Sequence, residues 1–152
     1  MRRHIAVLVI AAVAAGTLII SNIDGSATAV TTDLLFREEN CGAKASHCRI
    51  IGSRTGTHFG DTFVFSLRLL STTDGSAVGR DEGECVTLQR TAEGFFCDFV
   101  VHLQGGDVAV QGTIRFTSTS TVPVTGGTGA YEGASGFWRQ SRQNVRLHIV
   151  TP

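Results

Sequence analysis

The sequence predicts an all-β protein, and three observations carry this prediction. Eight short runs in which apolar and polar side chains alternate follow residue 29. Turn-forming residues, above all glycine, separate these runs. No segment after residue 29 keeps a helical period. Eight short strands at regular spacing form either a closed antiparallel barrel or a β-sandwich.

The strands follow from the alternation, and their ends follow from the turn residues. The predicted turns are Asp74-Gly75, Glu93-Gly94, Gly105-Gly106, the Gly126–Gly129 loop and Ser141–Gln143. The predicted strands, in chain order, are Asp33–Arg37, Ser46–Ile51, Asp61–Leu70, Gly83–Arg90, Phe95–Leu103, Asp107–Phe116, Ala134–Gln140 and Asn144–Val150.

Residues 1–29 are typical of a secretory signal peptide. Two arginines follow Met1, an apolar run extends from Ile5 to Ile20, and Ala27-Thr28-Ala29 is a small-x-small cleavage site. The apolar run is shorter than the roughly 20 residues that a membrane-spanning helix needs. We therefore predict cleavage after Ala29 and one secreted domain over residues 30–152, with no membrane association after cleavage. An uncleaved signal anchor is the alternative.

All four cysteines lie after the cleavage site, and an even count in an exported chain indicates two disulfides. Three pairings are possible. Cys85 and Cys97 fall opposite each other in a hairpin centred on Thr91, so we predict the pairs Cys85–Cys97 and Cys41–Cys48. A zinc site is the alternative, although these spacings lack the Cys-x-x-Cys pairs that zinc sites prefer.

Alternation assigns one face of each strand to the interior. An eight-stranded barrel is either filled by side chains or holds one small apolar ligand. The side chains assigned inward are Phe63, Phe65, Leu67, Leu69, Phe95, Phe99, Val101, Leu103, Val108, Val110, Ile114, Phe116, Val145, Leu147 and Ile149.

The stretch from Val122 to Trp138 contains five glycines, one proline and the only tyrosine, Tyr131. Its Gly126-Gly127-Thr128-Gly129 segment is not a phosphate loop, because such a loop needs a lysine after its last glycine and a helix behind it. We predict instead a tight turn that leads into a strand.

This glycine segment, followed by a small residue, Gly136 and an aromatic side chain, resembles a motif of the allene oxide cyclase-like and dirigent barrel superfamily. A second segment agrees in order and spacing: Gly60-Asp61-Thr62-Phe63-Val64-Phe65, then Leu69, Asp74-Gly75, Val78-Gly79 and Gly83. The resemblance covers residues 60–136 and favours an eight-stranded antiparallel barrel over a sandwich.

The resemblance also implies partners and chemistry. Related barrels form homodimers or homotrimers, and the apolar side chains on the outer face would suit such a contact: Val64, Val86, Leu88 and Val100. Cyclases of this superfamily fold a flexible apolar substrate into a reactive shape, without a cofactor, by orientation and desolvation. Glu132 and Ser135 stand where plant dirigent proteins tend to carry arginine, so the arginine that supports their chemistry has no counterpart here.

Asp61 and Tyr131 are the catalytic candidates. We expect their side chains to make the polar contacts with a bound molecule near the cavity mouth. Asp61 shares the face of Phe63 and Phe65, and burial beside an apolar cavity would raise the pKa of its carboxyl, as a general acid or base requires. In the alternative, the Asp61 carboxylate caps the backbone N–H groups of the turn at Gly60.

Phe63, Phe65, Phe99 and Trp138 are the predicted ligand-binding side chains. Trp138 combines a flat apolar face with one hydrogen-bond donor, and Gly136 on the same face would leave room for a ligand. In the alternative, Tyr131 and Trp138 plug the barrel end as part of the core.

Charge and histidine placement exclude several other functions. The 13 basic and 13 acidic side chains balance, so nucleic-acid binding is not expected. The five histidines are scattered and no Gly-x-Ser-x-Gly motif follows residue 29, so we predict neither a nucleophile triad nor a bound metal or cofactor.

Two functions remain for a barrel that binds a small apolar molecule. The first is a cofactor-independent cyclase or isomerase, or a dirigent-like protein that controls stereochemistry. The second is a non-catalytic secreted protein that carries a small lipid or has a filled, purely structural barrel. Predicted export favours the second function, and the absence of a triad or metal motif suits the first.

Overall fold

The computed structural model of the protein describes residues 28–41, 47–51, 58–88 and 94–152. Nearly all of the predicted signal peptide lies outside these residues, as does the predicted turn centre at Thr91. Within the described ranges, no helix is long and apolar enough to span a membrane.

Nine strands and one short 3-10 helix, η1, make up the described part of the chain. The elements are β1 (Val30–Glu38), β2 (Cys48–Ile51), β3 (Thr62–Ser71), β4 (Ala77–Thr87), β5 (Phe95–Leu103), β6 (Gly106–Ile114), β7 (Ser120–Gly127), η1 (Gly129–Tyr131), β8 (Ser135–Ser141) and β9 (Asn144–Thr151).

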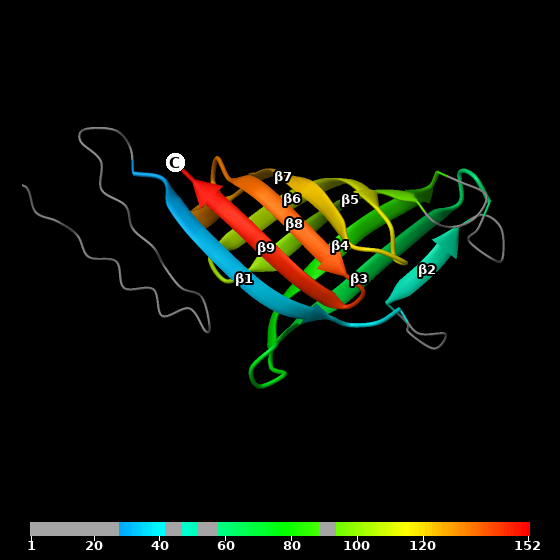
Figure 1. Ribbon diagram of the computed structural model, residues 1–152, viewed down its shortest axis with the longest axis horizontal. Coiled ribbons are helices and arrows are strands. Elements are labelled where there is room, and N and C mark those ends of the chain that lie inside the picture. The colour runs from blue at the N-terminus through cyan, green and yellow to red at the C-terminus, as the bar shows by residue number, and fades with distance from the viewer. Residues whose placement is uncertain (1–27, 42–46, 52–57, 89–93) are drawn as a thin grey trace, which may run out of the picture.

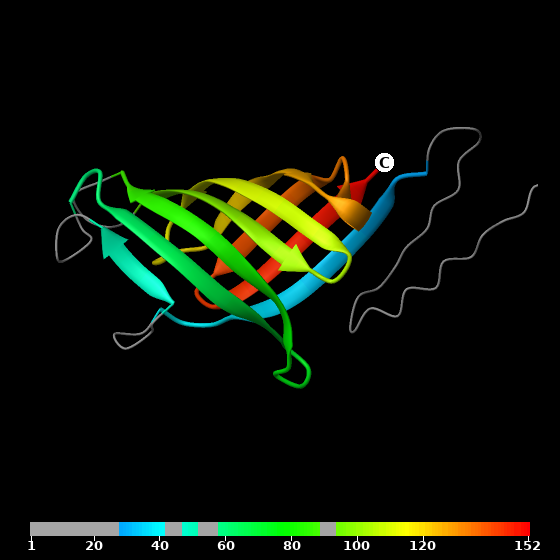
Figure 2. The same cartoon turned by 180° about the vertical axis from the view of Figure 1, so that it is seen from behind.

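The strands close into an eight-stranded antiparallel barrel, which confirms the predicted fold class (Figures 1 and 2). Neighbouring strands pair antiparallel from β3 in sequence order to β9, and β9 then pairs with β1. The pairing of Phe36 on β1 with Ser71 on β3 joins the two ends of this sheet. Closure removes the exposed strand edges that an open sheet would present.

Strand β2 lies outside the closed ring. It pairs only with the first half of β3, with Cys48 opposite Phe65, while β1 pairs with the second half of β3. The prediction that Ser46–Ile51 is one of the eight barrel strands was therefore wrong. Figure 2 shows β2 beside β3 at one end of the barrel.

The eighth barrel strand is β7, which the sequence pattern did not predict. The glycines and the proline of the Val122 stretch indicated a turn, yet Gly126 and Gly127 pair with Ala109 and Val108 on β6. The turn begins later, at Thr128, and continues through η1. Tertiary pairing on both sides thus overrides the low strand propensity of glycine and proline.

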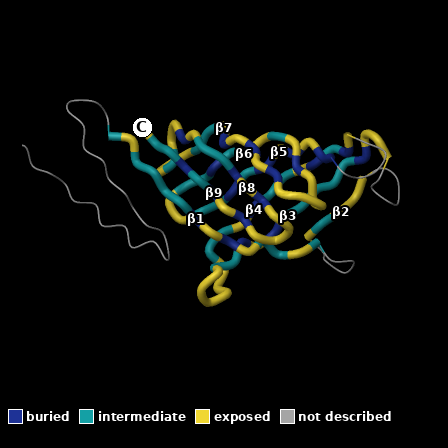
Figure 3. Tube along the Cα trace, in the orientation of Figure 1, coloured by how far each residue is buried: buried dark blue, intermediate teal, exposed yellow. Residues whose placement is uncertain are grey.

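The inner face of the barrel forms the core, largely as predicted. Leu69, Val101, Val108 and Leu147 are completely buried. Phe116 differs, because β6 ends at Ile114 and the Phe116 side chain is 44% exposed, with its ring 5.0 Å from that of Phe95. Figure 3 shows the alternation of buried and exposed positions along the strands and the exposed tip of the β3–β4 hairpin.

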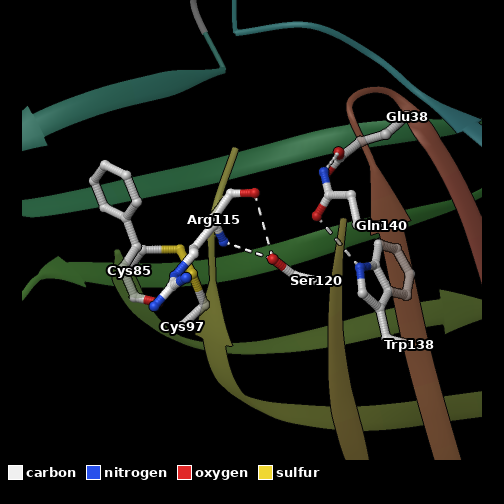
Figure 4. The surroundings of a disulfide bond; sticks show 8 residues. Glu38, Cys85, Cys97, Arg115, Ser120, Trp138 and Gln140 are labelled. Atoms are coloured by element: carbon white, nitrogen blue, oxygen red, sulfur yellow. Dashed lines mark hydrogen bonds between the residues drawn. A yellow bond between two sulfur atoms is a disulfide. The ribbon is translucent and has the colours of Figure 1, made fainter. Parts of the chain in front are cut away.

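Both predicted disulfides are confirmed. Cys85 on β4 lies directly opposite Cys97 on β5, and both side chains are buried inside the barrel (Figure 4). Cys41 is joined to Cys48, which ties the end of β1 to the start of β2. The two bridges use all four cysteines, so none is left as a thiolate ligand for zinc.

Candidate functional site

A cavity of about 640 Å³ opens at the end of the barrel where β3 begins and β4 ends. Its wall is mainly aromatic: the ring centroids of Phe63 and Phe65 lie 5.7 Å apart, and those of Phe65 and Phe99 lie 5.9 Å apart. The other apolar side chains that line it are Ile50, Leu67, Phe95, Ile114 and Phe116.

Two acidic side chains meet at the inner end of this cavity, and we call Glu38 and Asp81 the acid pair. Glu38 is the last residue of β1 and is partly exposed, whereas Asp81, in the middle of β4, is 1% exposed. The two carboxyl groups hydrogen-bond to each other. Two carboxyl groups can hydrogen-bond to each other only when one of them keeps its proton, so the pair retains a proton.

Burial changes the pKa values of both members of the acid pair. Burial raises the pKa of Asp81 to about 6, although the hydrogen bond with Glu38 offsets part of that rise. The pKa of Glu38 lies well above its usual range, first because of burial and then because of the nearby Asp81 charge. Between the two pKa values the pair holds one proton, which is the condition for giving and taking protons near neutral pH.

Gln140 connects Glu38 of the acid pair to Trp138 in the barrel core, as Figure 4 shows. Its side-chain amide donates to Glu38 Oε2 and, at 3.2 Å, to the carbonyl oxygen of Arg142. Its Oε1 accepts from Trp138 Nε1 at 3.4 Å. These hydrogen bonds fix the orientation of the Glu38 carboxyl, because each polar atom of the Gln140 side chain has a defined partner.

One oxygen of the acid pair lacks a partner. Asp81 Oδ1 is buried and has no hydrogen-bond partner within the described residues. A buried acceptor without a donor is rare in folded proteins and costs free energy, so this atom is available to a donor brought in by a ligand.

Asp61 lies at the cavity as predicted and also fills the structural role that was its alternative. It lines the cavity and is 7% exposed. Its Oδ2 accepts the backbone N–H of His58 at 3.0 Å, which holds the turn that enters β3. Within the described residues, no group of His, Cys, Asp and Glu side chains is arranged to hold a metal ion.

The predicted ligand-binding aromatics separate into two groups. Phe63, Phe65 and Phe99 line the cavity, whereas Trp138 is completely buried behind Phe99, with the two rings edge to face at 5.2 Å. Gly136 leaves no room for a ligand, because a Cβ there would lie 2.0 Å from the carbonyl oxygen of His148 on β9. The neighbouring strand β9 approaches Gly136 closely and occupies that space.

Tyr131 lies at the opposite end of the barrel from Asp61. It borders a second pocket of about 440 Å³ formed by Leu34, Val78 and Leu103 among others. Its hydroxyl donates to the carbonyl oxygen of Gln104 at 3.3 Å, and burial raises its pKa. The structure therefore does not bring the two catalytic candidates to one site.

The acid pair and Gln140 were missed by the sequence analysis, although alternation carried a signal for each. Glu38 has the parity of the inward Leu34 and Phe36, but the first strand was predicted to end at Arg37. Asp81 has the parity of Cys85, but the fourth strand was predicted to start at Gly83. Both strands are longer than their turn signals indicated.

The family comparison identifies the fold. A family model described as Dirigent-like protein matches residues 14–150. None of the curated proteins matches the chain.

Several solved structures share the fold at low identity. Pyocyanin demethylase is 23% identical with a TM-score of 0.62, over 78% of this chain and 99% of that chain. The pterocarpan synthase dirigent protein GePTS1 is 16% identical with a TM-score of 0.65, over 80% and 89%. The exo-specific intermolecular Diels-Alderase AbnU is 14% identical with a TM-score of 0.59, over 80% and 98%.

Proposed function

This chain belongs to the dirigent-like protein family, and we propose that it is a secreted barrel that binds a small, largely apolar molecule and catalyses its isomerisation or cyclisation without a cofactor. One observation carries the proposal. A cavity of about 640 Å³ with aromatic walls ends on two carboxyl groups that retain a proton. The volume falls within the roughly 300–1,000 Å³ of small-molecule sites.

The aromatic wall supplies binding and orientation. Phe63, Phe65 and Phe99 present flat apolar surfaces, which exclude water from a bound molecule and limit the conformations that it can adopt. For a flexible substrate, this restriction brings reacting atoms together before the chemical step. A wall of this kind cannot polarise a bond, so the reaction also needs the acid pair.

The acid pair supplies proton transfer. Glu38 faces the cavity and would protonate the substrate, while Asp81 beneath it receives or returns a proton through their shared hydrogen bond. Gln140 holds the Glu38 carboxyl in one orientation. Because the same pair can give a proton at one atom and accept one from another, an isomerisation needs no other acid or base.

The structural relatives support an enzymatic use of this barrel. Those described above are named as a demethylase of pyocyanin, a pterocarpan synthase and a Diels-Alderase. Two disulfides in this chain fit an oxidising compartment, in agreement with predicted export.

A non-catalytic carrier is the second candidate. Its support is the combination of predicted export and disulfides, because biosynthetic enzymes usually work beside cytoplasmic partners. In this case the cavity would bind the same class of molecule, and the acid pair would only hydrogen-bond it.

Tryptophan fluorescence and turnover distinguish the two. Trp138 is the only tryptophan and contacts Phe99 of the cavity wall, so ligand binding should quench or shift its emission. We would titrate apolar polyenes and oxylipin-like compounds and analyse the products. Glu38→Gln should abolish turnover and leave binding within a few-fold if Glu38 transfers the proton. Binding without turnover in the wild-type protein would support the carrier, and emission indifferent to all these compounds would overturn both functions.

A further inference from the structure

We propose that the ligand of this cavity carries a basic nitrogen, protonated when bound, which sits against the acid pair of Glu38 and Asp81. This inference rests on the proposed small-molecule function and specifies the chemical class of the ligand: an amine or a nitrogen heterocycle attached to an apolar, aromatic or polyene body.

The charge of the cavity lining favours a cationic ligand. Among the described residues, four acidic residues line the cavity, Glu38, Glu39, Asp61 and Asp81, against one basic residue, Arg142. Two of the acids are already occupied by other roles. Glu39 pairs with Arg68 at 2.7 Å, and Asp61 caps the turn at His58.

Within the described part of the chain, no basic side chain forms an ion pair with Glu38 or Asp81. Among the described residues, the acid pair is therefore an acidic group of the cavity whose negative charge is not balanced by a protein cation. A bound organic cation would provide that balance.

The hydrogen-bond partners that the site lacks also favour a protonated nitrogen. Asp81 Oδ1 is buried without a partner, so the site lacks a donor there. Gln140 cannot provide one to a ligand, because its amide nitrogen already donates to Glu38 and to the carbonyl oxygen of Arg142. A protonated nitrogen brings donors and no acceptor, which matches this need, whereas a carbonyl ligand would bring only another acceptor.

The aromatic wall beside the acid pair also suits a cation. Phe65 and Phe99 are neighbours in the same cavity, and aromatic faces attract cations through the ring quadrupole. Aromatic rings combined with carboxylates are well suited to an alkylated ammonium group, since the rings contact its apolar part while the carboxylates balance its charge.

The proton balance is simple. A neutral amine that meets the fully protonated pair takes one of its two protons: a carboxyl O–H bond breaks, an N–H bond forms, and the products are an ammonium ion and a pair that keeps one proton and carries one negative charge. No oxidant or other reactant is involved. An amine that arrives already protonated pairs directly with the singly charged acid pair, and the shared proton stays in place.

The inference makes binding depend on pH in a defined direction. Below a pH of about 6 Asp81 is protonated, the pair is neutral and a cation gains little from it. The other groups that bear on the pair are Glu82, whose charge raises the pKa of Asp81, and the cavity-lining Glu39, Asp61 and Arg142. The affinity for a permanent cation should therefore fall by up to about tenfold per pH unit below 6, the limit for uptake of one proton.

Three naphthyl probes, of which the cation and the neutral analogue have the same shape, test the charge preference by calorimetry at pH 8 and pH 5. They are (2-naphthylmethyl)trimethylammonium, its neutral carbon analogue 2-neopentylnaphthalene, and the anion 2-naphthylacetate. We expect the cation to bind at least about tenfold more tightly than the neutral analogue at pH 8, and this preference to shrink to a few-fold at pH 5. Tighter binding of the neutral probe or of the anion at pH 8 would overturn the inference, the anion by indicating that Arg142 dominates.

Matched variants locate the effect. Asp81→Asn should abolish the preference for the cation and leave affinity for the neutral probe within about twofold, because the amide keeps the shape of the carboxyl. Glu39→Gln is the control, since it removes a cavity carboxylate that Arg68 already neutralises, and it should keep the preference. A preference that survives Asp81→Asn and Glu38→Gln, each checked for folding by circular dichroism, would overturn the inference.

The same titrations separate this inference from the proposed function. Equal binding of the cation and the neutral probe would refute a ligand with a protonated nitrogen but leave the proposed function intact. No binding of any probe would count against both.

Discussion

Replacing Asp81 with asparagine should stabilise the protein at alkaline pH and have no effect in acid. The pKa of Asp81 rises from 3.8 to about 6 in the fold, chiefly because of burial. A group whose pKa is raised by folding contributes stability below its unfolded pKa, and that contribution is lost as the pH rises through the folded pKa. The relevant window therefore runs from about pH 4 to above pH 6.

The magnitude follows from the shift. One pKa unit corresponds to about 1.36 kcal/mol, so a rise of roughly two units costs the wild-type protein on the order of 3 kcal/mol at pH 8 relative to pH 4. Asparagine avoids this cost because it carries no charge. The substitution also removes the Asp81 charge that raises the pKa of Glu38. This second change likewise stabilises the variant relative to wild type at alkaline pH.

Urea denaturation at pH 4, 5, 6, 7 and 8 would measure the difference in unfolding free energy between Asp81→Asn and wild type. We expect this difference to rise from near zero at pH 4 to about 3 kcal/mol in favour of the variant at pH 8. Glu39→Gln is the control, and its effect should have the opposite sign. Because Arg68 lowers the pKa of Glu39, this variant should be less stable than wild type, and only at pH values above the pKa of Glu39. A difference that stays constant with pH, or a variant less stable than wild type at pH 8, would refute the account of the acid pair.

Three further predictions concern the scaffold. Leu147→Ala should lower the unfolding free energy by about 2–5 kcal/mol, because Leu147 is completely buried in the barrel, and a loss below about 1 kcal/mol would contradict its place in the core. Replacing Cys85 and Cys97 together with alanine should cost about 2–4 kcal/mol in the same measurement, whereas an unchanged denaturation midpoint would mean that this bridge does not constrain the unfolded chain. The secreted protein should have the intact mass of residues 30–152 and take up thiol label only after reduction, and a mass that includes residues 1–29 would disprove cleavage after Ala29.

Alternation was a reliable guide to the barrel interior, because one face of each strand packs into the core. Leu67, Val110 and Ile149 were all assigned inward from parity alone, and all three are buried. The hairpin symmetry around Thr91 likewise predicted Cys85–Cys97, since cross-strand partners in a ladder are fixed once the turn is located.

Strand ends and unusual strands were harder to predict, and the site depends on the strand ends. Val122 and Val124 alternate with polar neighbours, but Pro123 and Gly126 indicated a turn, so β7 was missed. Pairing with β6 and β8, which the local sequence does not encode, makes this segment a strand. The same limit hid Glu38 and Asp81, because each lies one or two residues beyond the predicted end of its strand.

Tyr131 illustrates a different limit. Residue type made it a good cavity candidate, but only the closed barrel shows which end of the molecule it occupies. Asp61 lies just before β3, at one end of the barrel. The turn after β7, which contains Tyr131, lies at the other end.

Native mass spectrometry of the secreted protein tests the central claim most directly, namely that the cavity beside Glu38 and Asp81 holds a small molecule. The account predicts that protein purified under gentle conditions carries an additional mass of a small organic compound, which is lost on denaturation and is reduced or absent in Asp81→Asn. A protein that shows only its own mass, and that gains none when incubated with cationic, neutral and anionic aromatic probes, would contradict the claim and leave the barrel with a structural role.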